Sequence, residues 1–324
     1  MQLESYVNTL GQHLKARFGT RVRKLSLHVG FTCPNRDGAL GRGGCTFCSV
    51  LSFSDGDPQA SVGDQLAAGK AATGRASRYL AYFQAYTNTY AEVEELRRLY
   101  AQALTGADIV GLCVGTRPDC VPDAVLEILA GYRDQGYEVW LELGLQSAHD
   151  ATLKRINRGH GFAAYADAVA RARRYGIPVC THLILGLPEE TPAMMMQTHA
   201  RVLDCGVEGL KLHPLMIVQG ATMAAQYARG SLLPMTLPAY VETAAELIRR
   251  TPAAVVFHRI TASARPPMLI APDWCYTRWP AADAICAELS RNGGQGSHLE
   301  LCGIASTAPS WEPICAAGMA MNKS

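Results

Sequence analysis

Three cysteines near the N-terminus have the spacing of a metal-binding loop. In the stretch FTCPNRDGALGRGGCTFCSV, residues 31–50, eleven residues separate Cys33 from Cys45 and two separate Cys45 from Cys48. Two thiolates that lie two residues apart on a turn can bind the same metal centre, and a third from a longer loop completes a three-ligand set. A structural zinc site takes four protein ligands, so a set of three leaves one coordination position open. The pattern predicts a metal centre with room for a further ligand; a zinc site or a redox-active Cys-x-x-Cys pair are the alternatives.

The residues around these cysteines are suited to holding a cofactor. Gly41, Gly43 and Gly44 let the backbone approach a bound group closely. Phe47, between the last two cysteines, offers an apolar face to an aromatic base. The loop is therefore a candidate for binding an organic cofactor beside the metal.

A second group of polar residues lies on an apolar run near the middle of the chain. Glu142, Gly144 and Gln146 occupy alternate positions, so they share one face of the expected strand. A carboxylate that faces inward at the mouth of a barrel is unfavourable unless it is paired or used. Hydrogen bonds from ribose hydroxyls, or an ion pair with a neighbouring arginine, would stabilise the Glu142 carboxylate.

Other ionisable residues fall at the ends of expected strands. Arg117 and Asp119 flank a proline, and they predict either an internal ion pair or a contact with a bound molecule. His182, Lys211 and His213 point to the same mouth and could bind an acidic substrate. A histidine on a strand is also commonly a hydrogen-bonded core residue, so both interpretations stay open.

These side chains must be positioned by an alternation of strands and helices. Apolar, β-prone runs predict strands at 25–29, 79–83, 108–114, 138–143, 178–185, 209–212 and 254–260. Helical periodicity predicts helices at about 60–76, 91–104, 122–134, 162–175, 190–205 and 237–250. Repeated βα units of this kind form a parallel sheet, which right-handed crossovers curl into a full or partial barrel. The carboxyl ends of such strands carry the active site.

The chain divides at about residue 285. Residues 1–285 are expected to form one core domain with an N-terminal extension. Residues 286–324 are rich in Gly, Ser and Ala and lack clear periodicity, so we expect an irregular tail that is either loosely packed or disordered.

Composition narrows the class of protein. With 48% hydrophobic and 18% charged residues, the chain can bury a large core, and its net charge of +2 excludes a general polycation. Basic residues gather near the N-terminus, at Lys15, Arg17, Arg21, Arg23 and Lys24, where they could contact phosphates or be a solvated helix end and strand start. The eleven cysteines, without a secretory signal or an apolar run that could span a membrane, predict a cytoplasmic protein.

Taken together, the motifs resemble those of radical S-adenosylmethionine (SAM) enzymes. The likeness covers roughly residues 5–285, and within that superfamily the chain resembles small bacterial radical SAM proteins related to the catalytic subunit of Elongator. The motifs that carry it are the cysteine loop with GFTCPNRDG, YFQAYTNTY at 82–90, GTRPDC at 115–120, ELGLQS at 142–147, NRGH at 157–160 and HLILGLP at 182–188.

This resemblance implies a fold, a cofactor and a reaction. The fold would be a partial (β/α)6-type parallel barrel. Cys33, Cys45 and Cys48 would hold a [4Fe–4S] cluster, and SAM would bind the iron that has no cysteine. A reduced cluster, supplied with an electron by a donor such as flavodoxin or ferredoxin, would cleave SAM to a 5′-deoxyadenosyl radical that abstracts a hydrogen atom from the substrate.

The resemblance also implies cofactor-binding residues. The end of the second strand is where the family holds the methionine amino group, often with Gly-Gly-Glu. Gln84, Thr87 and Asn88 lie there in this chain and would contact SAM; the alternative is that they form a hydrogen-bonded turn. Arg158 would bind the methionine carboxylate. Gly186 would let the backbone pass close to adenine. Further contacts to SAM are expected from Phe47, Glu142 and Gln146.

Likeness to the catalytic subunit of Elongator implies that the substrate is tRNA, with chemistry at the wobble uridine. The chain ends before an acetyltransferase domain, so we expect a different reaction, such as trimming or remodelling a side chain already on the uridine. Splayed anticodon bases suit a barrel mouth. The alternatives are a radical SAM enzyme that acts on a small metabolite or a protein side chain, and a noncatalytic zinc-binding or redox-sensing protein.

Overall fold

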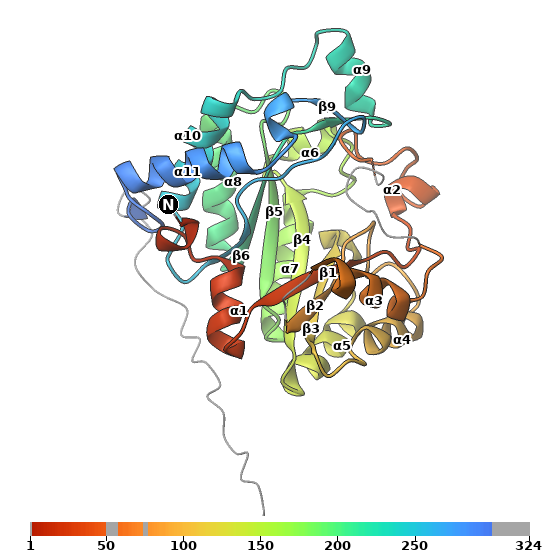
Figure 1. The fold of residues 1–324 in the computed structure, drawn as a ribbon. Helices are drawn as coiled ribbons and strands as arrows, with labels where there is room; N and C mark the ends of the chain where they lie inside the picture. Colours follow the sequence, from red (N-terminus) through yellow and green to blue (C-terminus); the bar gives the residue numbers. More distant parts are fainter. Residues whose placement is uncertain (1, 50–57, 74–76, 300–324) are drawn as a thin grey trace, which may run out of the picture.

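A seven-stranded parallel sheet forms the centre of the protein. The computed structural model describes residues 2–49, 58–73 and 77–299 (Figure 1). Neighbouring strands run in the order β1-β2-β3-β4-β5-β6-β8, all parallel, so the sheet follows the chain without a reversal. The strands are β1 (Val22–Leu27), β2 (Arg78–Phe83), β3 (Ile109–Thr116), β4 (Glu138–Gln146), β5 (Val179–Leu185), β6 (Gly209–Pro214) and β8 (Val256–Arg259).

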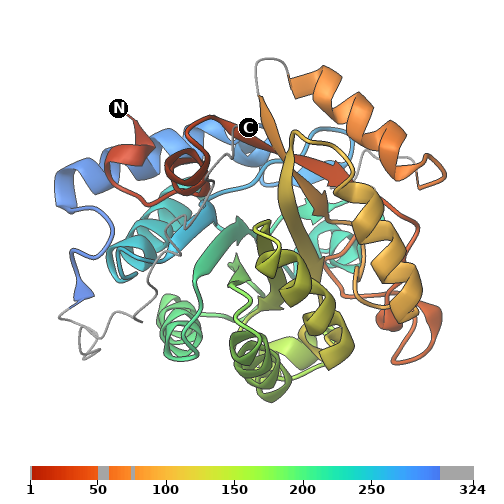
Figure 2. The same ribbon diagram turned by 90° about the horizontal axis from the view of Figure 1, so that it is seen from below.

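Helices cover the outer face of this sheet, which curls into a half-barrel (Figure 2). All eight residues of β3 are buried, as expected for a parallel strand enclosed on both faces. The long crossover helices that follow the strands are α3 (Val62–Thr73), α4 (Val93–Ala103), α5 (Asp123–Asp134), α7 (Phe162–Arg174), α8 (Pro192–Asp204) and α10 (Leu237–Arg249). Gly136 and Gly176, which follow α5 and α7, have φ angles of 91° and 64°, so each is in the left-handed conformation that ends a helix before the next strand.

The remaining elements lie at the ends and the open side of the half-barrel. They are η1 (Leu3–Ser5), α1 (Leu10–Phe18), α2 (Pro34–Asp37), η3 (Pro118–Cys120), α6 (Asp150–Arg155), β7 (Ile217–Val218), α9 (Thr222–Ala228), β9 (Leu269–Ala271), η4 (Asp273–Cys275) and α11 (Trp279–Asn292). β7 and β9 pair antiparallel in a small second sheet beyond the carboxyl end of β6.

Helix α1 lies between the two edge strands, β1 and β8, which do not pair with each other (Figure 2). The segment before α1 is hydrogen-bonded to β8 and to the residues that follow α11. Phe257 N donates to Asn8 O at 2.8 Å, and Gln295 N donates to Tyr6 O at 2.8 Å. Inside the half-barrel, Lys24 Nζ of β1 lies 3.2 Å from His258 Nδ1 of β8. The N-terminal segment thus closes the gap in the barrel.

The expected fold is confirmed: it is an α/β half-barrel with a parallel sheet, and each predicted strand and long helix is present. The boundary predicted at residue 285 falls inside α11, which continues to Asn292 and buries Cys286, so the start of the predicted irregular tail is wrong. Residues 300–324 of that tail lie outside the described residues. Across the described ranges, no helix is both long and apolar enough to cross a membrane.

Candidate active site

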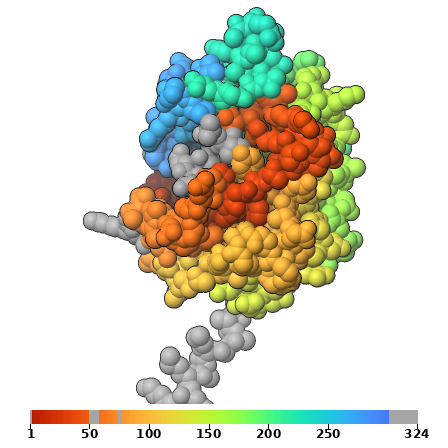
Figure 3. Space-filling view, turned by 90° about the vertical axis from the view of Figure 1, so that its right-hand side faces the viewer, coloured from red at the N-terminus to blue at the C-terminus, as the bar shows by residue number. Residues whose placement is uncertain are grey.

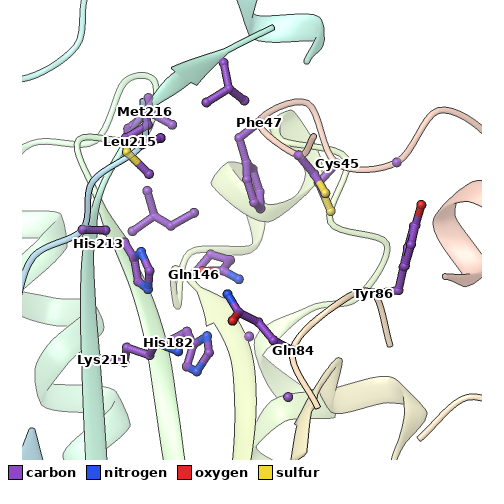
Figure 4. Close-up of a pocket in the computed structure, with 18 of the residues that line it drawn as sticks. Cys45, Phe47, Gln84, Tyr86, Gln146, His182, Lys211, His213, Leu215 and Met216 are labelled. Carbon is purple, nitrogen blue, oxygen red and sulfur yellow. The ribbon is translucent and has the colours of Figure 1, made fainter. Parts of the chain in front are cut away.

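A cavity of about 780 Å³ opens at the carboxyl ends of the parallel strands. Its walls come from the cysteine loop, from the ends of β2 to β6 and β8, and from the chain between β8 and β9. Figure 4 shows Cys45 and Tyr86 on one side, His182, Lys211 and His213 on the other, and Gln84 and Gln146 between them. The sequence-predicted residues that line it are Cys33, Cys45, Phe47, Cys48, Gln84, Thr87, Arg117, Glu142, Gln146, Arg158, His182, Lys211 and His213.

The cysteine loop is held in shape by its own backbone. Cys33 is the N-cap of α2, and its carbonyl accepts a hydrogen bond from Arg36 N at 2.7 Å. Cys48 N donates to Cys45 O at 3.0 Å, which makes the tight turn that a Cys-x-x-Cys pair needs. Cys45 is buried and the other two cysteines are half-buried, and none of the three is in a disulfide. The loop with α2 lies on the surface between α9 and the helices α3 and α4 (Figure 3).

The NRGH segment, residues 157–160, docks against this loop. Asn157 Nδ2 donates to Gly44 O at 2.8 Å, and Asn35 Nδ2 donates to Asn157 O at 2.6 Å. Thr46 N donates to Ile156 O at 3.0 Å. A Cβ at Gly159 would lie 2.4 Å from Asn35 Oδ1, so glycine is needed for this close approach. The segment thus fixes the cysteine loop from a position over a hundred residues away in the chain.

Hydrogen-bond donors and positive charges surround the thiols. Arg158 Nη1 lies 3.5 Å from Cys45 Sγ, and Asn35 Nδ2 lies 3.7 Å from the same sulfur. Arg36 Nη2 donates to Cys48 O at 2.8 Å. Burial and repulsion from Cys45 raise the pKa of Cys48, while Arg36 and Arg158 act in the opposite direction. The two guanidinium groups therefore stabilise the thiolate form, which is the form that binds metal.

The arrangement of the three cysteines suits a cluster with several metal atoms. Within residues 2–49, 58–73 and 77–299, no three His, Cys, Asp or Glu side chains are close enough to share one metal ion. In a [4Fe–4S] cluster each thiolate binds a different iron, so the cysteines need not converge on one point. Cys33, Cys45 and Cys48 line one wall of the cavity, with cationic donors behind them, and this donor set fits such a cluster.

Backbone strain and an unsatisfied hydroxyl mark the wall next to the cysteines. Tyr86 and Gln146 line the cavity with φ angles of 64° and 81°, which are unusual for residues other than glycine. Thr87 Oγ1 is buried and has no hydrogen-bond partner in the described part of the chain. A Cβ at Gly144 would lie 2.8 Å from both Arg158 Nη2 and Gln146 Nε2, so the bare Cα lets these side chains meet. This wall presents polar groups that a bound molecule can satisfy.

Two residues expected to contact SAM do not line the cavity. Asn88 is fully buried, and its amide donates to Phe83 O at 3.1 Å and to Gly115 O at 2.7 Å, so it joins the ends of β2 and β3. Gly186 packs against Met235, whose Cγ would lie 2.5 Å from a Cβ at that position. The geometry gives both residues a structural role.

Glu142 lies at the floor of the cavity and is fully buried. It forms ion pairs with Lys24 and with Lys211, the latter at 3.1 Å. His182 Nε2 and His258 Nδ1 donate to its two oxygens at 2.7 and 3.0 Å. Burial raises the pKa of Glu142, but the two lysines and the two histidine hydrogen bonds outweigh burial and hold it well below its usual range. Residues of four other strands thus stabilise the charge of Glu142, which also lines the cavity.

Arg117 forms the predicted internal ion pair. Its Nε and Nη2 donate to the two oxygens of Asp119 at 3.0 and 2.8 Å. Arg117 also lines the cavity, and its Nη1 is buried without a partner among the described residues. Both sequence-based interpretations thus remain compatible with its position.

The basic N-terminal cluster does not reach the cavity mouth. Arg17 pairs with Glu138, the first residue of β4, at the end of the barrel opposite to the cavity. Lys24 is committed to Glu142 inside the barrel. Two of the five basic residues are therefore partners in ion pairs within the chain, Arg17 at the surface and Lys24 inside the barrel, which supports the interpretation of this cluster as a helix end and strand start.

Two arginines on the cavity wall were not expected from the sequence. Arg259 ends β8, where it registers with Lys211 of β6, and Arg265 lies between β8 and β9. The signal for Arg259 was present, because an ionisable pair, His258 and Arg259, ends an otherwise apolar strand. Arg265 follows no strand of the main sheet, so no pattern pointed to it.

Comparisons with known proteins agree with this site. Residues 32–202 match the Radical SAM superfamily, and residues 207–291 match the Radical_SAM C-terminal domain. The chain is 57% identical over 300 residues to Protein YhcC of Escherichia coli strain K12, covering 92% of this chain and 97% of that protein. It is 32% identical over 129 residues to a tRNA uridine(34) acetyltransferase of Dehalococcoides mccartyi, covering 39% of this chain and 27% of that protein.

A solved structure shows the same fold. The archaeal Methanocaldococcus infernus Elp3 with an N-terminal deletion superposes with a TM-score of 0.60 at 17% identity, covering 83% of this chain and 63% of that chain. The Radical SAM match includes all three cysteines of the cavity wall and spans more than half of the chain. The protein is therefore an enzyme of the radical SAM superfamily, whose members use a [4Fe–4S] cluster and SAM.

Proposed function

We propose that this enzyme modifies a side chain on the wobble uridine of tRNA. The observation that carries the proposal is the 32% identity to a tRNA uridine(34) acetyltransferase, a protein whose name states its target nucleotide. The shared segment covers 27% of that protein. The proposed reaction is the remodelling of an existing uridine side chain by hydrogen abstraction, the chemistry of the radical SAM superfamily. A cavity of about 780 Å³ at the barrel mouth is large enough for a cosubstrate and a splayed base together.

In this proposal the cysteine side of the cavity binds the cofactor. Cys33, Cys45 and Cys48 hold the cluster, which when bound supplies the electron that cleaves SAM to a hydrogen-abstracting 5′-deoxyadenosyl radical. Arg158, held by the Gly144 carbonyl, is placed beside Cys45 to bind the methionine carboxylate. Phe47 offers its ring to adenine.

The polar residues between the two walls complete the cosubstrate site. Gln84 is anchored by Ser26 Oγ, which donates to Gln84 Oε1 at 3.0 Å, so its amide nitrogen is available for SAM. Thr87 and Gln146 supply further hydrogen bonds to the amino acid and ribose parts. Binding in this enclosed cavity orients SAM and keeps water from the radical.

A second candidate is a small anionic metabolite. It is favoured by the N-terminal basic cluster, in which Arg17 pairs with Glu138 at the end of the barrel opposite to the cavity and Lys24 pairs with Glu142. A small substrate needs no phosphate contacts outside the cavity, whereas a tRNA would use them.

The test measures SAM cleavage and tRNA modification separately. Anaerobically reconstituted enzyme is reduced with SAM and assayed for 5′-deoxyadenosine. Bulk tRNA from a strain lacking the gene is then incubated with this mixture, and its nucleosides are compared by mass spectrometry before and after. A mass change confined to the wobble position is expected, together with a dependence of 5′-deoxyadenosine formation on added tRNA.

The matched control is the Cys33/Cys45/Cys48→Ala triple variant, which should change neither the nucleosides nor SAM. Deletion-strain tRNA with an unchanged nucleoside profile, in a reaction that does form 5′-deoxyadenosine, would refute the tRNA substrate and favour the small metabolite. Zinc in place of iron in the reconstituted protein would refute the radical reaction itself.

A further inference from the structure

The cavity wall opposite the cysteines carries more positive than negative charge. At its floor the ammonium group of Lys211 faces the single carboxylate of Glu142, and Lys24, behind the floor, pairs with the same carboxylate. His182 and His258 add no charge at neutral pH, because burial lowers their pKa values to about 4 and about 3. One cationic charge is therefore left over before the arginines of this wall are considered.

Arg259 adds a second positive charge at the same level of the barrel. It pairs in register with Lys211, and its side chain is exposed to the cavity. Arg265, from the chain between β8 and β9, is exposed at the same wall. Among the described residues, neither guanidinium group has a hydrogen bond or an ion pair.

The other arginines of the cavity are already engaged. Arg36 donates to Cys48 O, Arg117 is bidentate to Asp119, and Arg158 donates to Gly144 O. The free guanidinium groups therefore belong to one side only, the side built by the Radical_SAM C-terminal domain. The cavity therefore has two halves. The cysteine half is suited to the cofactor, and the β8 half carries the guanidinium groups of Arg259 and Arg265, which have no partner among the described residues.

The surroundings of these two arginines strengthen their attraction for an anion. Apolar side chains line the same half: Ile184, Leu215, Met216, Val218 and Met268. His213 lies beside them with its ring 6.1 Å from that of His182, and burial with nearby cations keeps its pKa well below the usual value, so it is neutral (Figure 4). The apolar side chains lower the effective dielectric constant around this half, so a charge–charge contact there is stronger than one surrounded by water alone.

We propose that Arg259 and Arg265 bind an oxyanion of the substrate, a carboxylate or a phosphate group, at the β8 side of the cavity. The planar guanidinium fork matches the two oxygens of either group. The inference rests on the proposed radical SAM reaction on a substrate in this cavity. The anion holds one end of the substrate at β8, so the carbon that loses hydrogen lies toward the cysteine half.

The experiment measures anion binding separately from catalysis. Reconstituted enzyme with SAM is titrated calorimetrically with inorganic phosphate in one arm and acetate in the other, so that the two sources of the oxyanion are distinguished. Arg259→Gln and Arg265→Gln, alone and combined, are compared with wild type. Arg278→Gln is the matched control, because Arg278 is exposed over the Trp279 ring and does not line the cavity.

Saturable binding of at least one anion is expected for wild type and for the Arg278 control. Each single variant should weaken it at least about tenfold, with a larger loss in the double variant. SAM affinity and iron content should be unchanged in all of them. Arg259→Lys keeps the charge and should retain part of the affinity.

Three results would overturn the proposal: wild type that binds neither anion, a double variant that binds as wild type does, or a loss of SAM affinity in Arg259→Gln. The last result would assign these arginines to the cosubstrate. Anion binding is read without turnover, so failure of the tRNA reaction and failure of the anion site are separate outcomes.

Discussion

Lys211 Nζ donates a hydrogen bond to the phenolic oxygen of Tyr82, 2.8 Å away, across the interior of the half-barrel from β6 to β2. The same ammonium group bonds to Glu142 at 3.1 Å. Burial, opposed by Glu142 and assisted by Arg259 and Lys24, lowers the pKa of Lys211 to about 8. The floor of the active site therefore holds a group that exchanges a proton near neutral pH, in contact with a tyrosine whose pKa burial raises well above its usual value.

The first prediction concerns the carboxylate that binds this lysine. Glu142→Gln leaves two buried ammonium groups without their counter-charge, and breaking a buried pair in this way costs about 3–5 kcal/mol of unfolding free energy. Urea unfolding of the apoprotein measures the loss. Glu95→Gln, which removes an exposed pair with Arg98 on α4, should change the midpoint very little. Equal effects of the two substitutions would contradict a structural role for the Glu142 network.

The second prediction is a pH dependence that originates far from the active site. His199 on α8 is buried, and its Nε2 lies 2.8 Å from Thr251 Oγ1. Burial, with Arg250 acting in the same direction and Glu246 opposing it, lowers the pKa of His199 to about 3. The unfolded chain binds this proton at higher pH than the folded one, so the His199 contribution to stability is complete above about pH 6.5 and is lost progressively toward pH 3.

His199→Gln should therefore flatten the curve of unfolding free energy against pH, by about 1.4 kcal/mol per pH unit between pH 4 and 6. Thr251→Val is the control: it removes the hydrogen bond but not the titrating group, so it should lower stability without changing the slope. Denaturant unfolding at several pH values measures both. An unchanged slope in His199→Gln would refute the assignment.

The third prediction concerns the cluster ligands. Cys45→Ala, Cys33→Ala and Cys48→Ala should each lower the iron bound after reconstitution and abolish 5′-deoxyadenosine formation, because a three-thiolate site has no ligand to spare. Cys286→Ala, at a buried position of α11 away from the cavity, should keep both iron and activity. Iron and sulfide content, with visible absorption, provide the measurement. Full iron content in Cys45→Ala would show that another residue holds the cluster.

The fourth prediction concerns Arg158. Arg158→Gln removes a charged hydrogen bond beside Cys45, so SAM should bind about 10- to 100-fold more weakly. Arg155→Gln is a close match three residues earlier, on the outer surface, where Arg155 pairs with Glu189, and it should leave SAM affinity unchanged. Calorimetry with the reconstituted enzyme distinguishes the two variants. Equal affinities would assign the methionine carboxylate to another residue.

The fold was predictable from sequence because each buried strand and each amphipathic helix carries its own local pattern. Only the end of helix α1 was expected, as one interpretation of the basic cluster. Its start was missed, although Thr9 and Gln12 form a capping box there, because the apolar stripe that follows is weak. The cysteines were found because their spacing is local as well.

The interactions around Glu142 could not be predicted in the same way. Its partners come from β1, β5, β6 and β8, and only the curvature of the sheet brings these strands around one carboxylate. The docking of Asn157 on Gly44 depends on the same long-range geometry. Residue types at strand ends therefore indicate where chemistry takes place, but not which residues touch.

The position of α1 determines the order in which the barrel can be completed during synthesis. Asn8 and Tyr6 precede every strand of the sheet in the chain, whereas their partners, Phe257 and Gln295, follow β6. The N-terminal segment must therefore wait, unpaired, while the strands from β1 to β6 assemble. The gap between β1 and β8 can therefore close only after β8 has been made, and until then the charged interior around Lys24 is without its β8 neighbour, His258.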